Sequence, residues 1–367
     1  MAGSSIGNIF RITTWGETHG KGVGVVVDGV PAGLELCEDD IQVYLNRRKP
    51  GQSQFVSPRK EGDLVEILSG VFEGKTTGSP VSLIVHNTNQ RSKDYSNIMN
   101  CYRPGHADYT FDEKYGFRDY RGGGRSSARE TIGRVAAGAI AAKILKQMGI
   151  SFTAYAKEIG GIMIDETKMD VEEIFKNPFY MPDAEAAEKV AVFAKKMMEE
   201  KNSIGGIVEC RIQGVPAGLG DPVFEKISAN LGKAVLSIGA VKGFEIGDGF
   251  AVAKSNGAVN NDNFCVAEDG SVEKETNHSG GTLGGMTDGN EIIFRAAFKP
   301  TPSIAQAQST INKDREAIEI EISGRHDPII VPRAVVVVEA MAAITIVDAL
   351  LMNMTARLVR ICDFYKK

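Results

Sequence analysis

Several features that mark common protein classes are missing from this chain. The five cysteines are far apart, odd in number and include no CxxC pair, which argues against a disulfide scaffold or a thiolate zinc site. The five histidines show no HExxH-type spacing, so we expect no metal centre. The net charge is −5 and no aromatic–basic repeat is present, so we expect no nucleic-acid partner.

Long uninterrupted apolar runs are also missing. The N-terminal stretch has no basic segment followed by an apolar one, so no secretory signal is evident. The most apolar stretch, residues 334–352, is interrupted by Glu339 and Asp348, which predicts a buried core helix rather than a membrane span. With 367 residues, 43% of them hydrophobic, the chain has enough apolar side chains for a large core. The sequence therefore predicts a cytoplasmic protein without a membrane partner.

The segment YRGGGRSSARET, residues 120–131, is the most informative one. Ser127 and Glu130 match the S-x-x-E capping box, which predicts a helix that starts at Ser127 and continues with helical periodicity over 132–148. A glycine-rich loop that enters a helix offers free backbone N–H groups at the positive end of the helix dipole.

Arginines converge on the same helix start. Arg125 and Arg129 both lie there, and a guanidinium group matches phosphate and carboxylate oxygens in two-point fashion. The segment therefore predicts an anion-binding site. The alternative is a capped helix whose arginines are merely solvated.

An internal repeat indicates a duplicated fold. The hexapeptide GVPAGL occurs at Gly29–Leu34 and again at Gly214–Leu219. Each copy follows a predicted strand and precedes a predicted helix, and each half later reaches a glycine-rich loop and a long helix of small residues. The pattern predicts an α+β fold, a β–α–β sandwich with central helices between two antiparallel sheets. We expect one domain over 1–367, with related halves of about 1–160 and 203–357 and a peripheral helical insertion at about 165–202.

Two segments test this interpretation in detail. The stretch VKGFEIGDGFAVAK, residues 241–254, is predicted to form strand, turn and strand. The stretch GVFEGKT, residues 70–76, resembles a P-loop, but it has three residues instead of four before GKT and a strand follows it. We therefore expect no nucleoside triphosphate hydrolysis.

Two histidines lie in polar loops flanked by glycine, which favours chemistry over packing. His19 lies in TTWGETHG and His106 in RPGHADYT, and histidine moves protons near neutral pH. Taken singly, each is an even choice between a functional and a structural role. His86, at the end of a predicted strand, is predicted to be structural.

Seven motifs together resemble one family. GETHG, RRKPGQS, RPGHADYT, YRGGGRSSARET, GVPAGL, KPTPS and GRHDP all occur in this chain, which resembles the chorismate synthase family from its N-terminus to about Ala349. The resemblance implies a homotetrameric carbon–oxygen lyase of the shikimate pathway. Such an enzyme converts 5-enolpyruvylshikimate 3-phosphate to chorismate and phosphate by a 1,4-anti elimination. It requires reduced FMN, although the reaction has no net redox change.

The resemblance also implies roles for individual residues. His19 would protonate or stabilise the departing phosphate, and His106 would protonate the reduced flavin near N1. Ser127 and Asp327 would poise proton transfer at N5. The residues implied to hold the anionic groups of the substrate are Arg48, Arg129, Arg134 and Arg325. The residues implied to hold FMN are Arg125, Ser126, Ser127, Gly239, Ala240, Gly284, Lys299, Pro300, Thr301, Pro302, Ser303 and Arg325.

The resemblance leaves NADPH an indirect role. Many members carry an arginine at the position of Gln54, so NADPH is expected to act only through a separate flavin-reducing system.

Two other hypotheses compete with the lyase. One is a phosphate-ester hydrolase that uses His19 and His106 without flavin, and the other is a non-catalytic binder of phosphorylated ligands or RNA.

Overall fold

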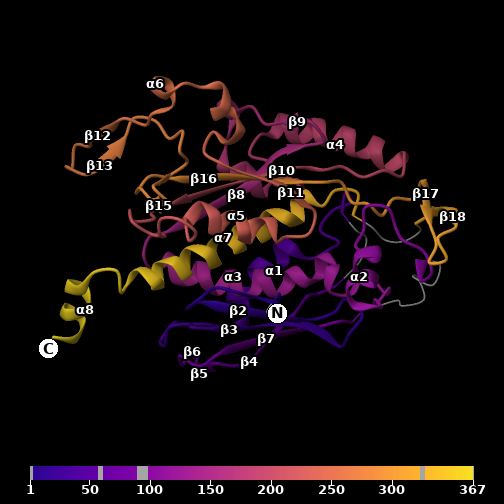
Figure 1. The fold of residues 1–367 in the computed structure, drawn as a ribbon, viewed down its shortest axis with the longest axis horizontal. Coiled ribbons are helices and arrows are strands. Elements are labelled where there is room, and N and C mark those ends of the chain that lie inside the picture. The colour runs from indigo at the N-terminus through magenta and orange to yellow at the C-terminus, as the bar shows by residue number, and fades with distance from the viewer. Residues whose placement is uncertain (1–2, 57–60, 89–97, 323–326, 367) are drawn as a thin grey trace.

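The computed structural model describes residues 3–56, 61–88, 98–322 and 327–366, in which two five-stranded antiparallel sheets enclose a layer of helices (Figure 1). The first sheet contains, in spatial order, β1 (Ser5–Ile6), β2 (Arg11–Gly16), β3 (Gly22–Asp28), β7 (Val81–His86) and β4 (Val65–Ser69). The second contains β9 (Ile162–Met163), β8 (Ser151–Ile159), β10 (Gly206–Gln213), β16 (Ile292–Phe298) and β11 (Val241–Ile246). The predicted β–α–β sandwich is confirmed.

Four strands of each sheet follow the same order, β2-β3-β7-β4 in the first and β8-β10-β16-β11 in the second. Both GVPAGL turns are held by the same hydrogen bonds. The hydroxyl of Thr76 donates to the carbonyl of Pro31 at 2.6 Å and accepts from the amide of Leu34 at 3.0 Å. In the second half, the hydroxyl of Thr287 donates to the carbonyl of Pro216 at 2.6 Å and accepts from the amide of Leu219 at 2.9 Å. The matching threonines show that the repeat has a structural basis.

The central layer is built from α1 (Glu38–Arg48), α3 (Thr131–Lys146), α5 (Ile227–Leu236) and α7 (Val331–Asn353). Among the described residues, α7 is the one helix long and apolar enough to span a membrane, but it is largely buried between the two sheets and is a core helix. The two acids that interrupt its apolar sequence have fixed partners. Glu339 forms a two-point ion pair with Arg47, and Asp348 accepts hydrogen bonds from the backbone amides of residues 8–10.

The helix after the glycine loop begins later than predicted. Ser127 caps a short 3₁₀ turn, Ala128–Glu130, and α3 proper starts at Thr131. The capping box is half formed, because Ser127 accepts from the amide of Arg129 whereas Glu130 pairs with Arg134.

One further prediction is wrong. Residues 249–254 form a 3₁₀ turn instead of the second strand predicted in VKGFEIGDGFAVAK. The strand of the second half that pairs with β10 is β16, in an antiparallel register. The predicted structural role of His86 does not involve burial, because its half-exposed ring lies at the end of β7, 3.6 Å from Glu66.

The insertion covers the outer side of the second sheet. Its helix α4 (Ala184–Glu199) buries Ala186, Val190 and Ala194, and it lies beside β9 in the upper layer of Figure 1. The remaining helices are α2 (Asp108–Tyr115), α6 (Gly257–Asn260) and α8 (Leu358–Tyr365). Two-stranded hairpins are formed by β5 (Val71–Phe72) with β6 (Lys75–Thr76), β12 (Phe264–Val266) with β13 (Val272–Lys274), β14 (Thr282–Leu283) with β15 (Met286–Thr287), and β17 (Ala307–Ile311) with β18 (Ala317–Glu321).

The helices α3 and α7 approach closely at Gly138. A Cβ atom there would lie 2.3 Å from the Cβ and 2.5 Å from the Cα of Ala340, so the two helix backbones leave no room for a methyl group. We expect Gly138→Ala to lower the free energy of unfolding by about 1–3 kcal/mol, although alanine normally favours a helix. Denaturant titration of the purified variant measures this change.

Gly232 in α5 provides the matched control. A Cβ there meets atoms of Phe244 at 3.4 Å or more, which is ordinary contact. Gly232→Ala is therefore expected to be neutral or to stabilise by up to about 1 kcal/mol. Equal effects of the two substitutions would contradict the close approach of α3 and α7.

Candidate active site

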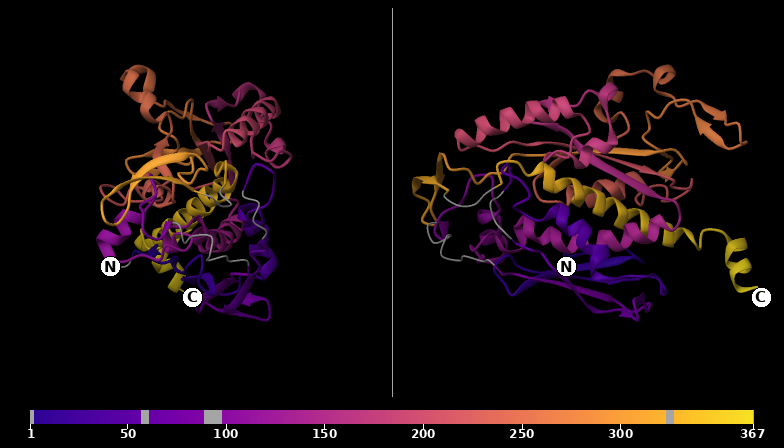
Figure 2. Two further views of the ribbon diagram at one scale, coloured as in Figure 1. Left: turned by 90° about the vertical axis from the view of Figure 1, so that its right-hand side faces the viewer. Right: turned by 180° about the vertical axis from the view of Figure 1, so that it is seen from behind.

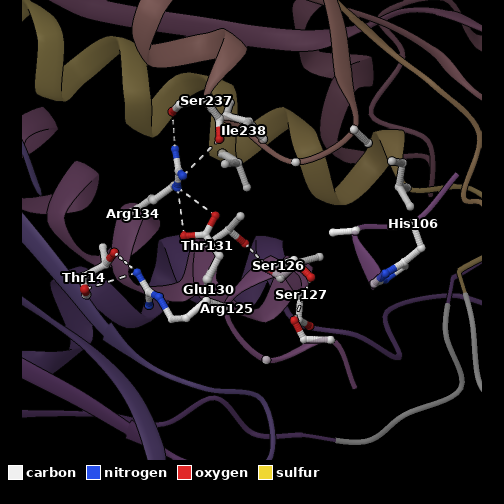
Figure 3. Close-up of a pocket in the computed structure, with 18 of the residues that line it drawn as sticks. Thr14, His106, Arg125, Ser126, Ser127, Glu130, Thr131, Arg134, Ser237 and Ile238 are labelled. Atoms are coloured by element: carbon white, nitrogen blue, oxygen red, sulfur yellow. Dashed lines mark hydrogen bonds and ion pairs between the residues drawn. The ribbon is translucent and has the colours of Figure 1, made fainter. Parts of the chain in front are cut away.

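A cleft of about 1690 Å³ lies between the two halves. The first half contributes the glycine loop, the start of α3, and α2 with the loop before it. The second half contributes the turn 237–242, the KPTPS loop and the N-terminal part of α7. Figure 3 shows Ser126, Ser127 and His106 on facing sides of this space. The cleft therefore forms only when the two halves pack together.

The glycine loop brings the two candidate histidines together. A Cβ on Gly122 would lie 2.7 Å from the ring of His19, and a Cβ on Gly123 would lie 3.2 Å from the ring of His106. Both glycines have positive φ, 65° and 82°, a region that favours glycine. Consecutive residues thus contact two histidines that are distant in sequence. His106 lines the cleft, whereas His19 is buried behind the loop.

The cleft is positively charged within an acidic chain. Nine arginine and lysine residues line it, against four acidic residues, whereas the whole chain has a net charge of −5. Charge of one sign on low-dielectric walls concentrates counter-ions. The arrangement is suited to a small ligand with several negative charges.

Arg48 lies in a buried ion-pair network at one wall of the cleft. Asp63 accepts hydrogen bonds from Arg48 and, at 2.8 Å, from Arg129. Burial alone would raise the pKa of Asp63, but the two guanidinium groups outweigh it and hold that pKa below its usual range. Burial and the nearby cations Arg333 and Arg129 lower the pKa of Arg48 to about 10. The carboxylate of Asp63 lies near two positive charges, which lower its pKa. The guanidinium of Arg48 lies near other positive charges as well as Asp63, and these charges and burial lower its pKa.

Arg333 extends this network to Asp327. Its guanidinium donates to the carboxylate of Asp327 and, at 2.9 Å, to the carbonyl of Arg48. Both Asp327 and Arg333 line the cleft. The N-terminal part of α7 therefore fixes the position of the predicted catalytic carboxylate.

The arginines of the glycine segment are held by protein groups. Arg125 donates to the hydroxyl of Thr14 at 2.7 Å and to the carbonyls of Thr14 and Gly16 (Figure 3). Arg134 pairs with Glu130 at 3.0 Å and donates to the hydroxyl of Ser237 at 2.6 Å. Arg134 thus joins α3 of the first half to the end of α5 in the second half.

Lys299 connects two of the loops that line the cleft. Its ammonium group donates to the carbonyl of Gly105 at 2.6 Å, which joins the KPTPS loop to the loop of His106. Burial and the nearby Lys242 lower the pKa of Lys299. Ala240 has a φ of 74°, a conformation that is costly for a residue with a side chain.

The structure brings most of the predicted site residues into one cleft. Those that line it are His106, Ser127, Asp327, Arg48, Arg134, Arg125, Ser126, Gly239, Ala240, Lys299, Thr301 and Pro302. Their individual roles stay predictions. Arg325 lies outside the described residues.

Some predicted residues are placed elsewhere. Arg129 is buried against Asp63, Glu61 and Asn87, so its guanidinium serves the ion-pair network rather than the cleft lining. Gly284 lies in the turn of the β14–β15 hairpin, at the opposite end of the second sheet from α2, so within one chain it does not reach the cleft (Figure 1). Pro300 and Ser303 belong to the KPTPS loop but are not among the lining residues.

Several residues at or next to the cleft were not predicted from the sequence. Arg333 follows GRHDP closely and is a cation at the start of an apolar helix, which was a usable signal. Asp108 lies in the RPGHADYT motif, two residues after His106, which was also a usable signal. Asp63 gave no signal, because a single carboxylate outside a motif is common. Their importance comes from arginines that the fold places beside them.

A sandwich of two five-stranded sheets with a cationic cleft is the architecture of a protein suited to a multiply charged small ligand. The chain belongs to the chorismate synthase family, whose model matches residues 10–351. It is 71% identical over 367 residues to chorismate synthase of Agathobacter rectalis and 68% identical to that of Lachnospira eligens, with full coverage of each chain. Family membership assigns it an enzymatic role in chorismate biosynthesis in the shikimate pathway.

A solved structure supports the same conclusion. The structure described as the crystal structure of chorismate synthase superposes with a TM-score of 0.76 at 32% sequence identity and covers 98% of each chain. The fold and the family assignment therefore agree.

The ion-pair network around Asp63 leads to a stability prediction. Asp63→Asn leaves two buried guanidinium groups without their shared carboxylate, so we expect the free energy of unfolding at neutral pH to fall by about 3–5 kcal/mol. Because the folded pKa of Asp63 is lowered, its contribution is complete above the unfolded pKa of about 3.9 and is lost as pH falls towards the folded value. The difference between wild type and variant should therefore narrow in acid.

Urea titrations at neutral and acidic pH measure this difference. Asp28→Asn is the control, because Asp28 forms an exposed pair with Arg11 at 3.6 Å, which is worth about 1 kcal/mol or less. A difference for Asp63→Asn that stays constant with pH would contradict the network.

Proposed function

We propose that the chain converts 5-enolpyruvylshikimate 3-phosphate to chorismate and phosphate by 1,4-anti elimination. The observation that carries this proposal is the glycine loop whose consecutive residues contact His19 and His106. The substrate has a phosphate and two carboxylates, and the nine cations of the cleft offer the charges that such a ligand needs. The elimination removes a proton and a phosphate, so it needs proton-transfer groups beside the anion site.

The cleft also fits reduced FMN, the cofactor that we propose. A single drug-sized ligand fills about 300–1,000 Å³, and the cleft of about 1690 Å³ has room for cofactor and substrate together. Its floor is apolar, from Ala334, Val337 and Met341 of α7, and its edge is cationic. A flat ring system with a charged tail matches this division. When bound, reduced FMN supplies electron density that assists the departure of phosphate.

The residues of the chain position the reactants and control protons. Arg48, with Lys299 and Arg333, holds the anionic groups against the cationic wall. His19 protonates the departing phosphate, and His106 acts near flavin N1. Ser127 and Asp327 move a proton at flavin N5, and the ion pair with Arg333 keeps Asp327 in place. NADPH acts only through a separate source of reduced flavin.

We also propose that the chain assembles as a homotetramer. Apolar side chains are exposed on elements that extend from the body, such as Phe264 and Val266 of β12 and Leu358, Phe364 and Tyr365 of α8. Figure 2 shows α8 extending away from the sandwich near the C-terminus. Such apolar surface is typical of a contact between subunits.

An anaerobic assay tests the proposed reaction. Purified protein is mixed with chemically reduced FMN and 5-enolpyruvylshikimate 3-phosphate, and chorismate is followed by its ultraviolet absorbance. We expect chorismate to form only when reduced FMN is present, because phosphate departure depends on the cofactor. The control omits the flavin or uses its oxidised form.

The same assay separates the competing functions. Phosphate release without chorismate, insensitive to oxygen, would identify a phosphate-ester hydrolase. Binding of the substrate with no phosphate release under any flavin condition would identify a non-catalytic binder.

Light scattering of the purified chain tests the assembly. We expect a mass of four chains of 39.5 kDa. A variant with Leu358→Ser and Phe364→Ser on α8 should shift the mass downward if α8 forms a subunit contact, because the exposed apolar side chains drive association. An unchanged tetramer would place the contact elsewhere, and a monomeric wild type would contradict the proposed assembly.

A further inference from the structure

The ring of His106 is held on the side away from the cleft by a buried ion pair. Asp108 accepts hydrogen bonds from the side chain of Arg103 at both of its oxygens, each at 2.7 Å, and from the Arg103 backbone amide at 3.0 Å. Arg103 and Asp108 are 5% and 4% exposed. Burial would raise the pKa of Asp108, but the hydrogen bonds from Arg103 outweigh it and hold that pKa well below its usual range. The pair is therefore charged and rigid.

The Nδ1 atom of His106 faces this pair. It lies 3.0 Å from the terminal nitrogen Nη2 of Arg103 and 3.3 Å from Oδ1 of Asp108. The same Nη2 carries two hydrogens and lies 2.7 Å from Oδ1, so one hydrogen reaches the carboxylate and the other reaches Nδ1. A guanidinium nitrogen donates but does not accept. If neutral Nδ1 carried a hydrogen, two donors, Nδ1 and Nη2 of Arg103, would face each other at 3.0 Å. That distance is shorter than the 3.3 Å from Nδ1 to the acceptor Oδ1 of Asp108.

We infer that Arg103 fixes neutral His106 as its Nε2–H tautomer, so that His106 presents a hydrogen-bond donor to the cleft in both of its protonation states. The other edge of the ring carries Cε1 and Nε2 and lies against Gly123 at the cleft. In the neutral ring, Nε2 carries the hydrogen because Nδ1 accepts from Arg103. In the imidazolium, both nitrogens carry one, and Oδ1 of Asp108 is the acceptor for Nδ1–H.

This inference refines the role of His106. A ring with Nδ1–H and a bare Nε2 would face the cleft as an acceptor or a base. A ring with Nε2–H supplies a donor to a developing negative charge without first taking up a proton. Arg103 and Asp108 are thus positioning residues that act through His106. Only the effect on turnover rests on the proposed function, because the tautomer is a property of the unliganded chain.

Nitrogen NMR of the histidine-labelled chain tests the tautomer directly. At alkaline pH, once the ring has lost its second hydrogen, the two nitrogen signals show which nitrogen carries the remaining one. Loss of signals in His106→Gln identifies the ring. We expect wild-type His106 to carry the hydrogen on Nε2. A hydrogen on Nδ1 in the wild type would overturn the inference without any variant.

The same spectrum contains an internal reference. Nδ1 of His278 lies 2.6 Å from the carboxylate of Asp248, which only accepts, so neutral His278 should carry its hydrogen on Nδ1. Opposite tautomers of His106 and His278 in one sample are therefore expected.

Substitution of Arg103 tests its part in this arrangement. Arg103→Met removes the donor and frees Nδ1 to donate to Asp108, so we expect signals of the Nδ1–H tautomer to appear. Arg295→Met is the matched control, because Arg295 also pairs with a buried carboxylate, that of Glu209 at 2.6 Å, but does not line the cleft. An unchanged His106 tautomer in Arg103→Met would overturn the role of Arg103.

A second variant separates the two partners of Nδ1. Asp108→Ala removes both carboxylate oxygens, and with them the alternative acceptor, and leaves Arg103, so His106 should keep Nε2–H. A change to the Nδ1–H tautomer would show that Asp108, and not Arg103, determines which nitrogen of His106 carries the hydrogen. This comparison also remains available if Arg103→Met does not fold.

Turnover provides the functional readout. In the anaerobic chorismate assay, Arg103→Met should lower kcat by about tenfold or more, as removal of a donor from a developing charge does, while KM changes little. Arg295→Met should keep the wild-type kcat. A normal kcat with an altered tautomer would overturn the positioning role. If the wild type forms no chorismate, the proposed function fails, whereas the tautomer measurement still stands.

Discussion

The close contact of α3 with α7 at Gly138 is the constraint on which the rest of the structure depends. These helices belong to different halves, and the absence of a side chain at Gly138 lets their backbones meet at Ala340. Both helices begin at the cleft, α3 behind the glycine loop and α7 beside Asp327. If the helices were further apart, the loop and the carboxylate would no longer face a common space. The contact between the halves therefore creates the site.

Buried charge is the second element of the design. Asp63, Asp108 and Glu339 each pair with one or more largely buried arginines, and Arg48, the partner of Asp63, lines the cleft. Such pairs add little net stability, because desolvation offsets the attraction between the charges. Their effect is to fix positions, since a buried arginine that has lost its partner is costly. The cleft thus has cationic walls that do not rearrange freely.

The two histidines differ in how the chain exposes them. His106 lines the cleft on a rigid support, whereas His19 is buried behind Gly122. The Arg103–Asp108 pair holds the ring of His106 in a fixed direction. The two rings face neighbouring glycines, Gly122 and Gly123, of the same loop. The loop therefore brings two histidines that are distant in sequence to one place in the fold.

The sequence by itself determined the elements that depend on local pattern. Hydropathy defined the core helix α7, and the GVPAGL repeat revealed the duplication. The motifs indicated the family and twelve of the residues that line the cleft. The failures were local choices decided by packing, such as the 3₁₀ turn at 249–254, where strand propensity was overridden. Only the tertiary structure decided that Arg129 serves Asp63 instead of the cleft lining, that Gly284 lies far from the cleft, and that Arg103 faces His106. The reason is physical: a motif records which side chains are present, whereas the partner of a buried charge is fixed by segments distant in sequence that meet only in the folded chain.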